Sequence, residues 1–97
     1  MPAAVAKPLF VPLKTRYFRA FEDGTKTTEY RRYGPRWNER TARIGRPVTL
    51  SHGYSGARLY ARVRAARAIQ GSTLPDASPY LPTDMLLAIE LENIGPA

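Results

Sequence analysis

The chain contains no cysteine and a single histidine among its 97 residues. Without cysteine it can form no disulfide, no zinc ribbon and no thiol nucleophile. One histidine and scattered carboxylates do not supply a metal-ligand set, so we predict no metal site and no cofactor. No apolar run approaches the roughly 20 residues that a membrane helix needs, and the first residues lack a secretory pattern. We therefore expect a cytoplasmic protein with no membrane partner.

Basic residues are absent from the last third of the chain. Residues 7–67 hold all 15 Lys and Arg together with four acids, a net charge of +11. Residues 68–97 hold four acids and no base, a net charge of −4. Segregated charge of this kind favours an anionic partner. RNA or another single-stranded nucleic acid is the first expectation and a nucleotide or nucleoside the second; the alternative to both is a merely solvated surface.

The length of the chain allows one domain. We predict a flexible leader over residues 1–7 and a single domain over residues 8–97. The stretch PLFVPL (8–13) is typical of a short apolar strand at a sheet edge, because it carries two prolines. The next stretch, KTRYFRAFEDG (14–24), predicts an amphipathic helix of about two to three turns that ends at Gly24. Its apolar face holds Tyr17, Phe18, Ala20 and Phe21.

The stretch TTEYRRY (27–33) alternates as a strand. Glu29, Arg31 and Tyr33 then share one face, with Glu29 and Arg31 about 7 Å apart. Tyr30 points the other way, and we expect it in the core. A long basic loop should follow over residues 34–46.

PVTLS (47–51) is typical of a short strand, and RLYARVRAARA (58–68) alternates as a strand although its Ala and Arg content would equally suit a helix. We favour a strand, because the turn HGYSG links the two stretches as a hairpin. A proline-punctuated connection with room for one helical turn should follow. MLLAIEL (85–91) closes the chain as a strand with its odd-numbered residues facing the core. These elements predict a small α+β domain whose sheet is mostly antiparallel and curls into a partly closed barrel.

A short motif joins the predicted helix to the strand after it. Gly24, Lys26, Glu29 and Arg31 read G-x-K-x-x-E-x-R. This resembles the signature of the ASCH domain, a relative of the RNA-modifying PUA domains, and the likeness extends over about residues 8–94. It implies a small PUA-like β-barrel with one N-terminal helix before the second strand, and an RNA or nucleotide cleft beside the motif.

Some ASCH-like proteins are described as ribonucleases, others as amidohydrolases that act on acetylated cytidine. If this chain is an enzyme, the resemblance implies a hydrolase with Lys26 and Glu29 as the catalytic pair. The amidohydrolase pattern has Thr three residues after the motif Lys, where this chain has Glu29. That departure counts against deacylation.

The residues of this region also have chemistry of their own. Arg31 offers a fork of donors to a phosphate or a base edge, and Glu29 can accept from an exocyclic amine. Lys26, in the glycine turn, can reach a phosphate. The alternative for all three is a surface ion-pair cluster worth about 0–1 kcal/mol.

Aromatic and basic residues continue past the motif. Tyr33 and Trp37 can stack on unpaired bases, although a lone Trp in a small protein more often plugs one end of the barrel. The exposed-looking basic residues nearby are candidate phosphate contacts, each with a merely solvated charge as the alternative: Lys14, Arg16, Arg19, Arg36, Arg40 and Arg43. The predicted ligand site is therefore Lys14, Lys26, Glu29, Arg31, Tyr33, Arg36 and Trp37.

Three hypotheses follow. The first is a non-catalytic RNA-binding module, which we expect to be a monomer. The second is a small hydrolase of the same fold. The third is a protein-interaction module whose basic face meets an acidic partner.

Overall fold

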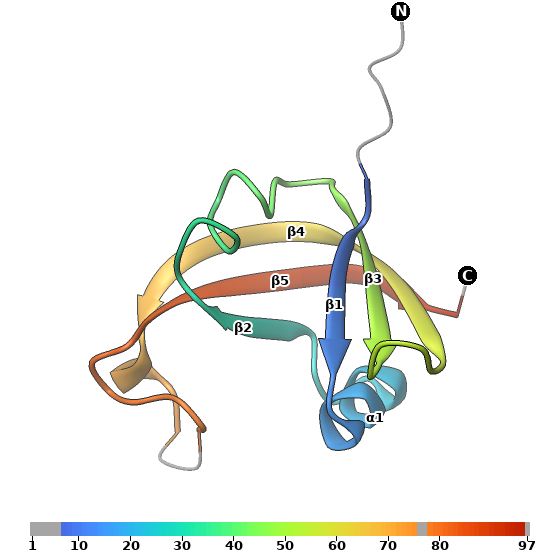
Figure 1. Ribbon diagram of the computed structural model, residues 1–97, viewed down its shortest axis with the longest axis horizontal. Coiled ribbons are helices and arrows are strands. Elements are labelled where there is room, and N and C mark those ends of the chain that lie inside the picture. Colours follow the sequence, from blue (N-terminus) through green and yellow to red (C-terminus); the bar gives the residue numbers. More distant parts are fainter. Residues whose placement is uncertain (1–6, 76–77, 97) are drawn as a thin grey trace, which may run out of the picture.

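One five-stranded sheet, in the order β1-β3-β4-β5-β2, curls into a half barrel (Figure 1). The computed structural model describes residues 7–75 and 78–96; six residues of the predicted leader, 1–6, lie outside this range. The elements are β1 (Leu9–Leu13), α1 (Thr15–Asp23), β2 (Thr28–Arg32), β3 (Pro47–His52), β4 (Arg58–Gln70), a 3₁₀ turn η1 (Gly71–Thr73) and β5 (Met85–Gly95).

The sheet is mixed. β1 pairs in parallel with β3, whereas β3–β4, β4–β5 and β5–β2 are antiparallel. The predicted α+β class, the largely antiparallel curled sheet and the helix between the first two strands are confirmed at this level. β1 and β2 are the two edge strands, so the open side of the half barrel lies between them.

The helix begins and ends as its sequence predicts. Phe18 and Phe21, three residues apart, lie on one side and are buried, because residues at this spacing share a helix face. Gly24 caps the helix in the left-handed region at φ 86°, where a side chain would be strained. No helix in the described ranges is long and apolar enough to cross a membrane.

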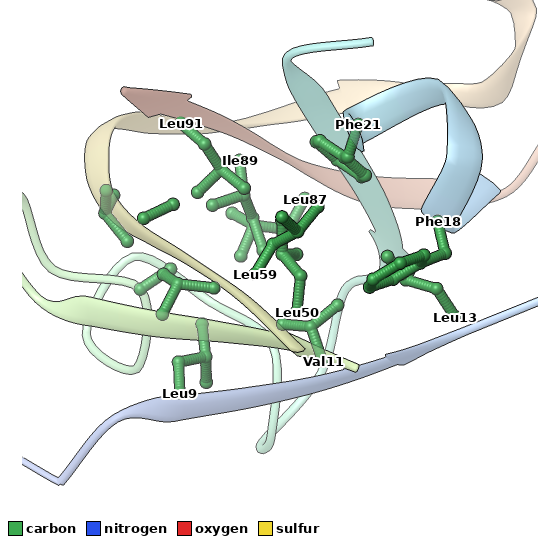
Figure 2. Packing of buried hydrophobic residues seen from close by; sticks show 14 residues of the cluster. Leu9, Val11, Leu13, Phe18, Phe21, Leu50, Leu59, Leu87, Ile89 and Leu91 are labelled. Carbon is green, nitrogen blue, oxygen red and sulfur yellow. The ribbon is translucent and has the colours of Figure 1, made fainter. Parts of the chain in front are cut away.

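The core lies on the concave side of the sheet, where α1 packs (Figure 2). It joins Phe18 and Phe21 to alternate residues of the strands, among them Val11, Leu50 and Val63. β5 contributes Leu87, Ile89 and Leu91 as its alternation predicts.

The prediction that Met85 faces the core is wrong, because its side chain is 48% exposed. Met85 pairs with the exposed Gln70 at the far end of the β4–β5 ribbon. Burial along β5 does not simply alternate, because Leu86 and Ala88 on the other face are buried as well, whereas Met85 at the first position of the strand is exposed.

Candidate functional site

A pocket of about 630 Å³ lies where α1, β2 and the loop before β5 meet. Its volume falls within the range of about 300–1,000 Å³ that small-molecule sites occupy. Aromatic and proline rings dominate the walls, with three charged side chains among them. The lining residues are Arg16, Tyr17 and Ala20 from α1, Lys26, Glu29 and Tyr30 around the start of β2, and Leu74, Pro75, Ser78, Pro79 and Tyr80 from the loop.

The turn after α1 is fixed by its own hydrogen bonds. The Lys26 amide donates to the carbonyl of Ala20 (3.0 Å), and the Thr25 amide donates to Asp23 Oδ1 (2.9 Å). The Thr25 hydroxyl also donates to Asp23, and these two bonds lower the pKa of the Asp23 carboxyl. The turn therefore holds Lys26 at a set place beside the helix.

Lys26 sits in a cage of aromatic rings. Its Nζ lies 5.5 Å from the ring centroid of Tyr17, 5.4 Å from that of Phe21 and 5.2 Å from that of Tyr30. Such distances allow cation–π attraction. Glu29 Oε1 lies 3.7 Å from the same nitrogen. The ammonium group is thus held at the pocket wall, with 19% of the side chain exposed.

Arg31 joins the two edges of the sheet. Its Nε donates to Glu29 Oε2 (2.8 Å), and its Nη2 donates to the carbonyl oxygen of Pro12 in β1 (2.8 Å). The guanidinium also stacks over Trp37, 4.9 Å from its ring centroid. We call this group of contacts the Arg31 bridge. It spans the open side of the half barrel and orients the Glu29 carboxylate.

The far wall of the pocket is the loop between η1 and β5. The Tyr80 hydroxyl donates to the carbonyl of Tyr30 (2.7 Å), which ties this loop to β2. Burial raises the pKa of Tyr80, and the nearby charge of Glu29 adds to the effect. At the base of the loop, the amide of Gly71 donates to the carbonyl of Asp84 (2.7 Å). The wall is therefore anchored at its base and at Tyr80.

The structure brings together part of the predicted site. Lys26 and Glu29 line the pocket, and Arg31 lies behind Glu29 without lining it. Tyr30, predicted as core, is only half-buried and lines the pocket instead. It lies on an edge strand near the helix, where the core does not cover it.

The other predicted site residues lie outside the pocket. Lys14 is exposed at the N-cap of α1, and Arg36 is exposed in the long loop. Trp37 is half-buried, packs against the core and carries the Arg31 guanidinium over its ring. Tyr33 is 42% exposed and bonds through its hydroxyl to Glu39, which raises the pKa of Tyr33 and lowers that of Glu39.

Sequence reasoning missed Tyr80 and the prolines beside it, and it placed Tyr17 only on the apolar face of a helix. The proline-flanked tyrosine in SPYLP was the available signal, since prolines hold an aromatic side chain in a stiff loop. Its contact with Tyr30 spans 50 positions of the chain, and no local pattern reveals such a contact.

No protein-family model matches this chain, and no curated protein does. Within residues 7–75 and 78–96, no group of three or more metal-ligating side chains is positioned to hold a metal ion. The pocket therefore has to be interpreted from its own chemistry: aromatic faces, two cations at the entrance and wall, and one oriented carboxylate.

Proposed function

We propose that this protein is an RNA-binding module that holds an unpaired nucleotide in the pocket between α1, β2 and the loop before β5. The observation that carries the proposal is the composition of the pocket. Tyr17, Tyr30 and Tyr80 line a cavity that also contains the side chains of Lys26 and Glu29. Unpaired bases bind to aromatic faces, and their phosphates bind to Arg and Lys.

Each part of a nucleotide has a matching group. A base can stack on the tyrosine rings, at about 1–3 kcal/mol per base. Lys26 at the wall and the exposed Arg16 are placed for a phosphate. Glu29 has lone pairs beyond those used by Lys26 and Arg31, so it can accept from an exocyclic amine of cytosine or adenine.

We further propose that the fold is of the PUA-like, ASCH type. Two features support this assignment. The motif residues Gly24 to Arg31 run from the end of α1 into β2, the placement that the resemblance implies. The sheet is also curled and mixed, with a single helix before its second strand.

A hydrolase of the same fold is the second candidate, favoured by the Lys26–Glu29 contact. The two groups are 3.7 Å apart in one pocket, close enough for proton transfer through a water or a substrate atom. In this role Lys26 and Glu29 would form the acid/base pair acting on RNA or on an acylated nucleoside.

The test is a titration of a fluorescent five-nucleotide RNA at several salt concentrations. We expect Lys26→Met to weaken binding. It should also make the negative slope of log K against log salt shallower by about 0.7, the value for one lost phosphate contact on a single strand. Arg19→Met is the matched control, because Arg19 is an exposed cation on the same helix that pairs with Glu22 (2.8 Å) outside the pocket.

The same samples separate binding from catalysis. RNA recovered intact supports the binding module, whereas products that disappear with both Lys26→Met and Glu29→Gln establish the hydrolase. Absence of binding at low salt, or equal losses for Lys26→Met and Arg19→Met, would refute the proposed pocket. Far-UV circular dichroism checks that each variant remains folded.

A further inference from the structure

The convex side of the sheet carries a second group of basic and aromatic side chains. Along the first half of β4, Leu59, Ala61 and Val63 face the core. The residues between them point to the opposite side, because successive side chains of a strand alternate. Together with neighbours from β1 and the β3–β4 turn they form what we call the outer patch: Phe10, Tyr54, Arg58, Tyr60, Arg62 and Arg64.

One half of the outer patch is organised around Arg58. Its guanidinium lies 5.1 Å from the ring centroid of Phe10, and its Nη2 donates to the carbonyl of Tyr54 (3.1 Å). The rings of Phe10 and Tyr54 are 6.2 Å apart at their centroids. Tyr54 is 78% exposed, so an aromatic face is available to a partner.

The other half is centred on Tyr60, which is 45% exposed. A shallow hollow of about 250 Å³ lies between Tyr60 and Arg62, with Pro8 and Pro47 in its wall. Strand pairing aligns Phe10, Thr49 and Tyr60 in one row across β1, β3 and β4. Two strand spacings place the two aromatic residues about 10 Å apart.

The positive charge of the outer patch is not neutralised within the described residues. None of Arg58, Arg62 and Arg64 forms an ion pair there. Arg62 is the cross-strand neighbour of Glu92, yet its Nη1 donates to the carbonyl of Gly45 (2.9 Å). The guanidinium groups remain available to an anion.

We propose that the outer patch is a second binding site, for single-stranded nucleic acid read through its base faces and phosphates. It shares no residue with the pocket, so it neither requires the proposed pocket function nor is required by it. An acidic protein would account for the arginines but leaves the exposed rings of Tyr54 and Tyr60 without a role. In a single-stranded nucleic acid, bases and phosphates alternate along the chain, and the aromatic rings and arginines of the outer patch alternate in the same way.

The experiment measures anisotropy of fluorescent oligouridine and oligothymidine 12-mers against the full chain at several salt concentrations. The main variant is Arg62→Gln/Arg64→Gln, which removes two exposed cations. Its control is Arg40→Gln/Arg43→Gln, which removes two exposed cations from the long loop and changes the net charge equally. Two lost phosphate contacts lower the salt slope by about 1.4 in the main variant.

A second pair of variants tests stacking. Tyr60→Ala should weaken 12-mer binding roughly 5- to 150-fold, whereas Tyr60→Phe, which keeps the ring, should bind as the wild type does. Oligouridine and oligothymidine should bind comparably, because no group of the outer patch is assigned to a 2′-hydroxyl. A mononucleotide offers the outer patch only one base and one phosphate, so its binding should report mainly the pocket and should change little among these variants.

Equal losses for the two double variants would overturn the proposal, because binding would then follow net charge and not the outer patch. An unchanged 12-mer affinity for Tyr60→Ala would overturn the stacking part, and a strong preference for RNA would overturn the assignment of the outer patch to base faces and phosphates alone. Failure of mononucleotide binding in the wild type would refute the pocket instead, so the two proposals fail separately.

Discussion

Replacing Arg31 by Met should destabilise the protein far more than replacing its neighbour Arg32 by Met. Glu29 is the reason, because its side chain is only 9% exposed and its nearest charged partner is Arg31 Nε at 2.8 Å. Without Arg31, Glu29 retains only the Lys26 contact at 3.7 Å. The carbonyl of Pro12 also loses its donor from the opposite edge of the sheet.

The size of the effect follows from burial. Removing one partner of a buried ion pair costs about 3–5 kcal/mol. Arg31 keeps 22% of its side chain exposed and Lys26 remains, so we expect the lower end, about 3 kcal/mol in the free energy of unfolding. For a domain of this size that lowers Tm by roughly 12–24 °C. Arg32 is 68% exposed and 3.7 Å from Asp84, so its replacement should cost about 0–1 kcal/mol.

Urea denaturation of both variants checks this expectation. Far-UV circular dichroism is the primary signal, because Arg31 stacks on the only tryptophan and its loss will change the fluorescence independently of folding. A double-mutant cycle with Glu29→Gln measures the coupling directly. If Arg31→Met costs no more than Arg32→Met, or if the coupling is near zero, the Arg31 bridge does not stabilise the fold by linking β2 to β1.

Two further predictions concern the loop that walls the pocket. A Cβ on Gly71 would lie 2.0 Å from the carbonyl oxygen of Leu81, so Gly71→Ala must displace the loop and, under the proposed function, should weaken nucleotide binding. Gly34→Ala meets nothing within 4 Å and should leave both stability and binding unchanged, and equal behaviour of the two variants would contradict this reasoning. Tyr80 has a pKa raised above the ordinary 10.0, so its contribution to stability is complete below about pH 10 and is lost as pH rises through its folded-state pKa. Tyr80→Phe should therefore lose less stability than the wild type as the pH rises above about 10 in parallel urea titrations, and identical pH profiles would show that the pKa is not raised.

Local patterns were sufficient for most of the fold. The shared apolar face of Tyr17, Phe18, Ala20 and Phe21 predicted α1, and Gly24 predicted its end. The alternation of β4 predicted a strand in spite of its many Ala and Arg, because the turn before it favoured a hairpin. The mixed order of the sheet was not accessible in this way, since the parallel pairing of β1 with β3 joins segments almost 40 positions apart.

The candidate site was predicted only in part. Lys26 and Glu29 were identified because they lie within one short motif. Arg31 was assigned to a ligand, whereas its hydrogen bonds join Glu29 to the carbonyl of Pro12. The face of β2 on which Arg31 lies is a local property, but the proximity of β1 to that face results from the curl of the whole sheet.

The sequence by itself therefore determined the elements, the main core-facing residues of each and the segregation of charge, because these depend on residues a few positions apart. Only the tertiary structure decided which residues meet. It placed Tyr80 against Tyr30, Arg31 against Pro12, and Phe10 in one row with Tyr60. Such contacts form because curling of the sheet lowers the free energy of the whole chain. That free energy depends on residues from several segments, so no single segment predicts the contacts.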